Sequence, residues 1–184
     1  VDTNGDGVVD SRDNPCVIFT TFSGYAYGGT GVIRVVDGVT GKELMAIVDS
    51  QNGIAGVGGL AMADLDGDGK PELIAVTSNL KAIVFRHDGT RLWTSETLGP
   101  RPPYGVATTP AIADLDGDGN PEIMIGKVVL NSNGTIKWLA SGKNEHPPIV
   151  SDLFDAGQQN VIIGASVYTS TGTLLWEGVD GYAA

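Results

Sequence analysis

A nine-residue stretch rich in aspartate and glycine constrains this chain more than any other feature, because it occurs twice almost unchanged. Residues 64–72 and 114–122 both read Asp-Leu-Asp-Gly-Asp-Gly, followed by Lys or Asn and then by Pro-Glu. Residues 2–10 form a third and looser copy. Three copies of one short motif predict an internally repeated fold.

The repeated stretch has the residue types of a metal-binding loop. Side-chain oxygens stand at positions 1, 3 and 5, a glycine at position 6 and a carboxylate at position 9. A hard cation such as Ca²⁺ takes about six to eight oxygen ligands, and a glycine permits the sharp bend of such a loop. The alternative is that runs of Asp and Gly merely form turns. We predict three Ca²⁺ sites, in which position 7 supplies its backbone carbonyl. The expected ligands are Asp2, Asn4, Asp6, Val8 and Asp10 in the first loop, Asp64, Asp66, Asp68, Lys70 and Glu72 in the second, and Asp114, Asp116, Asp118, Asn120 and Glu122 in the third.

The loops differ from an EF-hand at the closing position and in the segment after the loop. An EF-hand loop closes with Glu at position 12 and leads into a helix. Position 12 here is Ala75 in the second loop and Ile125 in the third, within apolar and β-branched runs typical of strands. The first loop has Asp13 at this position, which makes it an additional candidate ligand. We therefore predict loops that join two strands.

A second signature recurs after each loop: a turn glycine and, four residues later, a large apolar residue. The pairs are Gly41 and Met45, Gly89 and Trp93, Gly134 and Trp138, and Gly172 and Trp176. We predict an all-β chain of four repeats, at about residues 1–50, 51–98, 99–141 and 142–184. Four antiparallel strands in ~40–50 residues make one blade of a β-propeller. The Trp or Met near the end of each repeat is expected to pack between blades.

The first and fourth repeats depart from this pattern. The first shows strands at about residues 16–22, 31–36 and 42–48, with no strand ahead of its loop. In the fourth, Asp152 keeps position 1, but Phe154 and Ala156 stand at positions 3 and 5, so we expect no ion there. We expect the chain to be a piece of a larger propeller, or a subunit whose ends pair with flanking sequence or further copies.

The charge of the chain is explained by its loops. The net charge is −11, and half of the 22 acidic residues lie in the three loops. This acidity argues against a nucleic-acid partner. Extracellular Ca²⁺ modules bind in the range of about 10⁻⁴–10⁻³ M, so we expect a secreted or cell-surface protein. No apolar run approaches the roughly 18 residues of a membrane span, and Asn133 begins a glycosylation sequon on a turn.

The motif Ala-Asp-Leu-Asp-Gly-Asp-Gly-Lys/Asn-Pro-Glu-Leu/Ile, repeated and set between two strands, resembles the FG-GAP/VCBS repeats of integrin-α-like β-propellers. This resemblance implies blades around an axis, ions in the loop between the first and second strands, and an extracellular adhesion role. It extends ligation to the matching acids of the three intact loops and not to Asp152. The first loop also resembles a thrombospondin type 3 repeat or a dockerin loop, in which Asp13 would close the shell.

The leading interpretation is a non-enzymatic, calcium-stabilised module that binds a protein or glycan. One alternative is a fragment of a propeller-fold polysaccharide lyase, because rhamnogalacturonan lyases resemble this pattern. The 11 basic residues do not cluster, and His87 and His146 lack the spacing of a zinc site, which argues against catalysis. A second alternative is a carbohydrate-binding lectin, for which the aromatic loops at residues 24–31 and 100–104 would form a shared rim.

Overall fold

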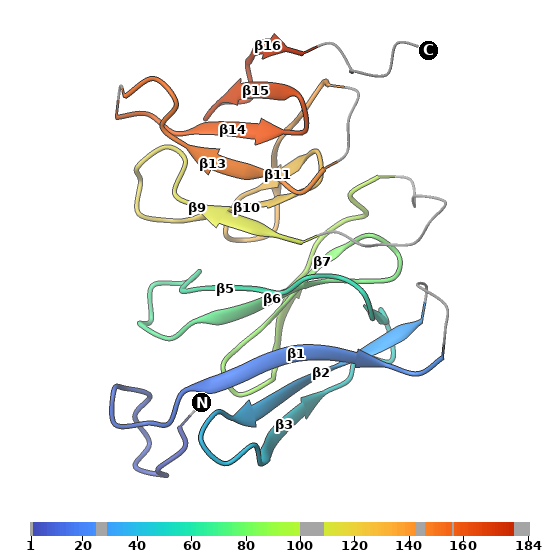
Figure 1. Cartoon of the computed structure of the whole chain (residues 1–184), viewed down its shortest axis with the longest axis vertical. Helices are drawn as coiled ribbons and strands as arrows, with labels where there is room; N and C mark the ends of the chain where they lie inside the picture. Colours follow the sequence, from blue (N-terminus) through green and yellow to red (C-terminus); the bar gives the residue numbers. More distant parts are fainter. Residues whose placement is uncertain (1, 25–28, 100–108, 143–145, 156, 179–184) are drawn as a thin grey trace.

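The computed structural model describes residues 2–24, 29–99, 109–142, 146–155 and 157–178, and in these residues every regular element is a β-strand. The strands form four sheets, each with four antiparallel strands, which succeed one another along the long axis of the molecule (Figure 1). The described part of the chain contains no helix that could cross a membrane. The predicted all-β fold with four-stranded antiparallel blades is confirmed.

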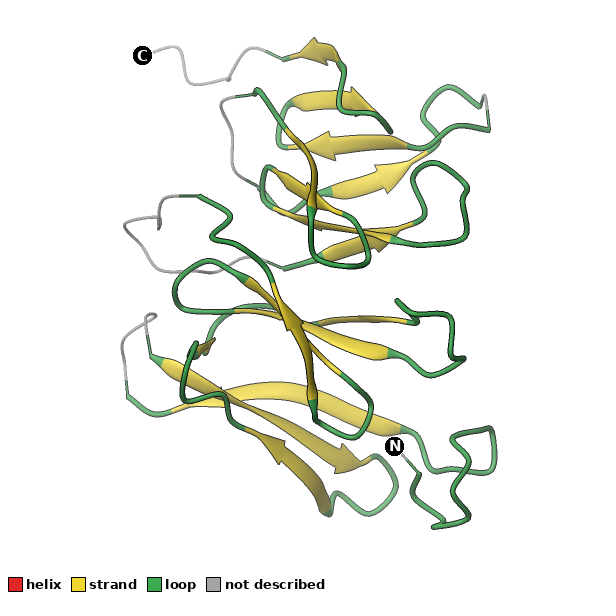
Figure 2. Cartoon of the chain, turned by 180° about the vertical axis from the view of Figure 1, so that it is seen from behind, coloured by secondary structure: helices red, strands yellow, loops and turns green. Residues whose placement is uncertain are grey.

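Blades 2, 3 and 4 are simple meanders in which each strand pairs with the next one along the chain. Figure 2 shows the same succession of sheets from behind. The first strand of blade 3 contacts the first strands of blades 2 and 4, so the blades meet along one side. Their strands are β5 (Ala61–Ala63), β6 (Glu72–Val76), β7 (Ala82–Phe85) and β8 (Arg91–Thr94) in blade 2, β9 (Ala111–Ala113), β10 (Glu122–Ile125), β11 (Val128–Leu130) and β12 (Ile136–Leu139) in blade 3, and β13 (Ile149–Ser151), β14 (Asn160–Ile163), β15 (Ser166–Thr169) and β16 (Leu174–Glu177) in blade 4.

Blade 1 is built differently. It contains β1 (Cys16–Phe22), β2 (Thr30–Asp37) and β3 (Glu43–Ile47), paired in that order. Within the described residues no strand pairs with the outer edge of β1, the place that β5 takes beside β6. As predicted, the first blade lacks a counterpart of β5 among the described residues.

A short fourth strand in blade 1 was not predicted. Strand β4 (Ile54–Ala55) pairs with the start of β2, and Ile54 also bridges to Thr77 in blade 2. The glycine-rich run around it lies close to β1, because a Cβ on Gly56 would lie 2.7 Å from the Cβ of Phe22. A two-residue strand is too short to show an alternating pattern, so the sequence could not reveal it.

The central strands of blades 2 and 3 are buried on both faces, and apolar after the glutamate that begins β6 and β10, because each of these blades has a neighbouring blade on either side. Successive side chains of a strand point to opposite faces. In β6, Leu73 and Ala75 join the cluster that packs against blade 1. Ile74 and Val76 join the cluster that packs against blade 3. A sheet buried on two sides needs continuous rather than alternating hydrophobicity, which is what the sequence has after each loop.

One recurring contact joins each blade to the blade before it. The turn glycine between the last two strands packs against the large apolar residue of the preceding blade. A Cβ on Gly134 would lie 2.8 Å from the ring of Trp93, and one on Gly172 would lie 2.6 Å from the ring of Trp138. Gly89 stands in the same relation to Met45. The two halves of the repeated glycine signature therefore meet across blades, and the predicted packing between blades is confirmed for Met45, Trp93 and Trp138. Trp176 of the fourth repeat is 53% exposed and does not pack in this way among the described residues.

Replacement of Gly134 by alanine tests this contact, with Gly41→Ala as a matched control. Both glycines have positive φ, at 85° and 71°, but a Cβ on Gly41 meets nothing within 4 Å. Gly41→Ala should lower the free energy of unfolding by about 1–2 kcal/mol, because alanine must take the left-handed conformation. Gly134→Ala should cost about 1–3 kcal/mol more, because the methyl group must displace a packed ring. Urea unfolding of both variants measures the difference, and equal losses would contradict the proposed role of the Trp93 contact.

Candidate metal centres

The aspartate-rich loops of blades 2 and 3 join the first and second strands of their blades, as predicted. They lie on the same side of the molecule as the loops of blades 1 and 4, at the left of Figure 1. The aspartate at position 1 organises each loop. In blade 2, the two carboxylate oxygens of Asp64 accept hydrogen bonds from the amides of Gly67 (2.7 Å) and Gly69 (2.9 Å). In blade 3, Asp114 makes the same two bonds, to Gly117 (2.8 Å) and Gly119 (2.9 Å).

The glutamate at position 9 fixes the loop to the protein core. Glu72 and Glu122 are only 1% and 2% exposed. Oε2 of Glu72 accepts the amide hydrogen of Leu65 at 2.8 Å, and Oε2 of Glu122 accepts that of Leu115 at 2.8 Å. Both leucines, at position 2 of the loop, are themselves buried. The apolar residue inside an otherwise polar motif is therefore an anchor that holds the loop over a buried carboxylate.

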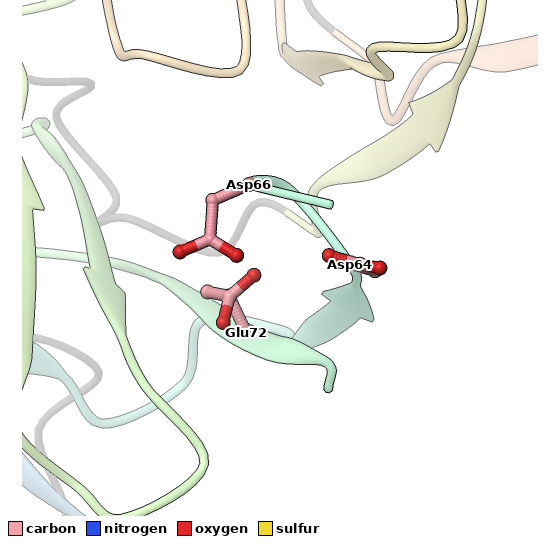
Figure 3. A group of neighbouring side chains, drawn as sticks. All are labelled: Asp64, Asp66 and Glu72. Atoms are coloured by element: carbon pink, nitrogen blue, oxygen red, sulfur yellow. The ribbon is translucent and has the colours of Figure 1, made fainter. Parts of the chain in front are cut away.

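Three carboxylates of each loop converge. Asp64, Asp66 and Glu72 in blade 2 can bring one oxygen each within 4.8 Å of the others, and so can Asp114, Asp116 and Glu122 in blade 3. Figure 3 shows Asp66 and Glu72 facing each other, with Asp64 beside them. A group of three carboxylates, one of them buried, has the chemistry to hold a hard divalent cation. Six of the predicted ligands are therefore placed together.

The remaining predicted ligands of these two loops are not in the converging groups. Asp68 and Asp118, at position 5, accept hydrogen bonds from the amides two residues further on, at 2.8 Å and 2.7 Å. Their carboxylates brace the loop in this structure. The ligand roles of Asp68 and Asp118, and of the backbone carbonyls of Lys70 and Asn120, stay predictions.

The electrostatics of the blade 2 loop favour a bound cation. Burial raises the pKa of Glu72, and the negative charges of Asp66, Asp68 and Asp64 raise it further, against the effect of the Leu65 amide. Like charges held this close destabilise the ionised loop. A divalent cation placed among them would remove that cost, so these residues fit Ca²⁺.

The blade 3 loop contains a feature that the sequence interpretation missed. Lys137, on β12, extends its ammonium group between Asp116 and Glu122 and hydrogen-bonds both, with 2.8 Å between Nζ and Oε1 of Glu122. This contact lowers the pKa of Asp116. Burial opposes the charge of Lys137, but its bonds to the two carboxylates raise the pKa of Lys137 overall. The signal was present in the sequence, because the corresponding residues of blades 2 and 4 are Leu92 and Leu175.

The first loop has the backbone of the others but does not gather its carboxylates. Asp2 accepts the amides of Gly5 (2.6 Å) and Gly7 (2.8 Å), as in the other loops. Its acids do not form a converging group among the described residues. The guanidinium of Arg12 instead pairs with Asp6 at 3.0 Å and with Asp10 at 2.7 Å.

The candidate extra ligand of this loop, Asp13, serves as a brace. Its carboxylate accepts the amides of Asp10 (2.9 Å), Thr3 (2.6 Å) and Asn4 (3.2 Å), and these bonds lower the pKa of Asp13 to about 2. The side chain of Asn4 likewise accepts a backbone amide within the loop, from Asp6, at 2.9 Å. Ion binding at the first loop, including the carbonyl of Val8, stays a prediction.

The loop of blade 4 keeps the hydrogen-bonded scaffold of the other loops, but it has Phe154 and Asn160 in place of the acids at positions 3 and 9 in blades 2 and 3. Oδ2 of Asp152 accepts the amide of Gly157 at 2.6 Å, and Oδ1 of Asn160 accepts the amide of Leu153 at 3.2 Å, in the place of the buried glutamates. Asp155 takes the left-handed conformation, with φ of 54°, at the position where the other loops have glycine. Phe154 is 59% exposed at position 3, where those loops have Asp or Asn. Residue 156 lies outside the described residues, and the expectation of no ion at this loop stays a prediction.

The aromatic loops, the glycosylation sequon and the basic residues were also named from the sequence. The aromatic residues Tyr25, Tyr27 and Tyr104 lie outside the described residues. Asn133 is exposed on the turn between β11 and β12, where a glycan can be accommodated. Among the described residues, four basic side chains are in ion pairs with acids: Arg12, Arg34, Arg91 and Lys137.

The family comparison agrees with the loops. Residues 64–125, which contain both converging groups, match the model of the FG-GAP-like repeat. The predicted resemblance to FG-GAP repeats is confirmed. The match covers about a third of the chain, and no curated protein matches the chain by sequence.

Comparison with solved structures extends the similarity to nearly the whole chain. The V. cholerae biofilm matrix protein Bap1 is similar with a TM-score of 0.76 and 29% identity, over 96% of this chain and 29% of that protein. Rhamnogalacturonan lyase PL11 of Bacillus licheniformis is similar with a TM-score of 0.60 and 21% identity, over 83% of this chain and 32% of the lyase. The exotype rhamnogalacturonan lyase YesX is similar with a TM-score of 0.58 and 20% identity, over 81% of this chain and 30% of that lyase. The chain thus spans about a third or less of each protein, and the likeness to the lyases shows the fold alone.

Replacement of Glu72 by glutamine tests the charge of the blade 2 loop. Glutamine retains an acceptor for the Leu65 amide and removes the negative charge. Because the folded-state pKa of Glu72 is raised, its contribution to stability is present at low pH and is lost as the pH rises through that pKa. In chelator at pH 7, Glu72→Gln should therefore melt above the parent protein by about 2–4 °C.

Two further measurements sharpen this test. The difference in melting temperature should shrink as the pH falls toward 4, where the parent glutamate is protonated. In about 2 mM Ca²⁺ the order should reverse, since an ion with a dissociation constant of about 10⁻⁴ M stabilises the parent by about 2 kcal/mol per site. Glu96→Gln, at an exposed position outside the loops, is the control for net charge. A parent protein that stays more stable than Glu72→Gln in chelator at pH 7 would refute the interpretation.

Proposed function

We propose that this chain is a calcium-stabilised, extracellular β-propeller segment that acts in adhesion or assembly and has no catalytic role. The observation that carries the proposal is the group of Asp64, Asp66 and Glu72, with its buried and electrostatically strained glutamate. The likeness to the biofilm matrix protein Bap1 over nearly the full chain supports the adhesive role. Each of the four repeats is one blade of this segment.

Calcium has a structural task in this proposal. Each loop connects the first strand of a blade, at the side where blades meet, to the buried second strand. An ion bound by the acids at positions 1, 3 and 9 links both ends of the loop and compensates their repulsion. The third loop and, by prediction, the first loop bind in the same way. Affinities of about 10⁻⁴–10⁻³ M suit a protein that works where calcium is millimolar, outside the cell.

The lyase alternative has one observation in its favour, which is the shared fold. A lyase needs a base that is free to act on the substrate. Both converging groups of the described residues contain acids alone, with no histidine among them, and Lys137 beside one of them is paired with two of its carboxylates. The binding function is therefore the better supported of the two. A protein or glycan remains the proposed ligand, and nucleic acid is excluded from the proposal because of the net charge of −11.

A glycan array combined with a lyase assay separates these functions. The chain is applied to polysaccharide and oligosaccharide spots in 2 mM Ca²⁺ and again in chelator, and rhamnogalacturonan is incubated with it under both conditions. We expect calcium-dependent retention on a class of glycans and no new unsaturated ends. The control is Glu72→Gln, whose retention should be weaker in calcium. Formation of unsaturated products, lost in chelator, would establish the lyase alternative instead.

The last strand of blade 4 is the proposed contact for a further unit of the assembly. Trp93 and Trp138 are covered by a turn glycine of the following blade, but Trp176 is 53% exposed and its neighbour Leu175 is 43% exposed. Continuity with the contacts between blades 2, 3 and 4 supports another blade of the same kind as the occupant. Flanking sequence or a second copy of this chain can supply it.

Sedimentation velocity tests this contact on the 184-residue chain in 2 mM Ca²⁺. We expect concentration-dependent association that Trp176→Glu abolishes, because a charge cannot be buried in the place of the indole without a large cost. Val39→Glu, at a position 69% exposed on a turn of blade 1, is the control and should associate like the parent. A parent chain that sediments as a monomer at all concentrations would rule out a second copy as the occupant.

A further inference from the structure

The loops of blades 2 and 3 are nearly identical, yet their surroundings differ in one charge. Eight of the nine loop residues are the same, and the exception is position 7, with Lys70 in one and Asn120 in the other. The ammonium group of Lys70 is in no ion pair with the described residues. In blade 3, Lys137 supplies a cation that lies directly on two of the three converging carboxylates.

The position of Lys137 results from an irregularity in strand pairing that all four blades share. In blade 3, Trp138 pairs with Val129 and Ile136 pairs with Leu130, so Lys137 is the extra residue of a β-bulge. The same shift occurs in the other blades, where the extra residues are Leu44, Leu92 and Leu175. A bulge redirects its extra side chain relative to a regular strand. Three blades place a leucine at this point, and blade 3 places a lysine.

The geometry makes Lys137 a direct competitor for a cation. Its side chain is 22% exposed, and that of Glu122 is 3% exposed, so their contact is largely shielded from water. A calcium ion needs carboxylate oxygens at about 2.3–2.6 Å, and here Oε1 of Glu122 and Oδ2 of Asp116 already accept hydrogen bonds from an ammonium group. Calcium can bind fully only after the ammonium has withdrawn from at least one of these oxygens.

We propose that Lys137 is a tethered counter-ion that lowers the calcium affinity of the third loop, so that two almost identical loops respond to different calcium concentrations. This inference rests on the proposed calcium binding of both loops. The second loop takes up calcium first and depends on it. The third loop holds its shape without calcium, because Lys137 neutralises part of its charge, and it loads only at higher concentration.

Isothermal titration of the full 184-residue chain with Ca²⁺ tests the proposal. The second and third loops of the parent should fall into two classes of site that differ in affinity. Lys137→Leu, which reproduces the residue of blade 2, should raise the affinity of the weaker class about tenfold or more, the scale of a hydrogen bond to a charged group. The gain should vanish when Asp114→Asn is added, which assigns the weaker class to the third loop. The reciprocal change Leu92→Lys should weaken the tighter class by a similar factor.

Melting in chelator gives a second readout that does not depend on calcium. Lys137→Leu should melt below the parent there, because Asp116 and Glu122 lose their partner, and it should gain more from added calcium than the parent does. Lys137→Met keeps the length of the side chain and serves if the leucine variant does not fold. Leu175→Lys places the same charge at the bulge of blade 4, beside a loop without the acidic group, and should leave both affinities unchanged.

The outcomes separate this inference from the function on which it rests. Two classes of site that keep their affinities in Lys137→Leu would overturn the role of Lys137 and leave calcium binding intact. The absence of calcium binding in the parent and in Lys137→Leu would overturn both. A weaker class that disappears with Asp64→Asn rather than with Asp114→Asn would also overturn the proposal, because the weaker site would then belong to the second loop.

Discussion

The structure depends on the packing of one blade against the next. No blade could bury its apolar side chains alone, since the central strands are apolar on both faces and each face needs a partner. The contact between a turn glycine and the ring or thioether of the preceding blade repeats at every junction between described blades. It works because glycine leaves room for an aromatic face to lie on the backbone. The loops that carry acids are then held at one side, on strands whose positions this packing has already determined.

The four loops show different solutions to one electrostatic problem. Each loop holds a buried or central polar side chain that accepts backbone amides of the loop. In blade 4 that side chain is the neutral Asn160, and no compensation is needed. In blade 3 the carboxylate of Glu122 meets an internal ammonium, and in blade 1 Arg12 pairs with the exposed acids. In blade 2, by contrast, Glu72 faces other carboxylates, and no protein cation among the described residues pairs with them. The same backbone thus supports loops with different amounts of uncompensated negative charge.

Much of this could be predicted from the sequence, and the reasons for the failures are physical. The loop motif, the strands that come after it and the glycine signature are local patterns, and they led to the correct fold class and to the six converging acids of blades 2 and 3. Strand β4 was missed because two residues show no periodicity. Lys137 was missed because its relation to Glu122 depends on a fold-back of the chain across two strands and on a bulge. Asp13 was predicted as an additional ligand from its spacing; its carboxylate accepts three backbone amides, and its ligand role stays a prediction.

The bulge in the last strand pair has a consequence for how such a fold can vary. Regular strand positions are tied to their neighbours, so a new side chain there disturbs the packing of a blade or its junction. The bulged residue pairs with no residue of the neighbouring strand, and it stands at the same place in every blade. At this position three blades have a leucine, and blade 3 has a lysine that contacts two acids of the neighbouring loop. Repeats built on one plan can in this way acquire individual properties through a single interchangeable residue.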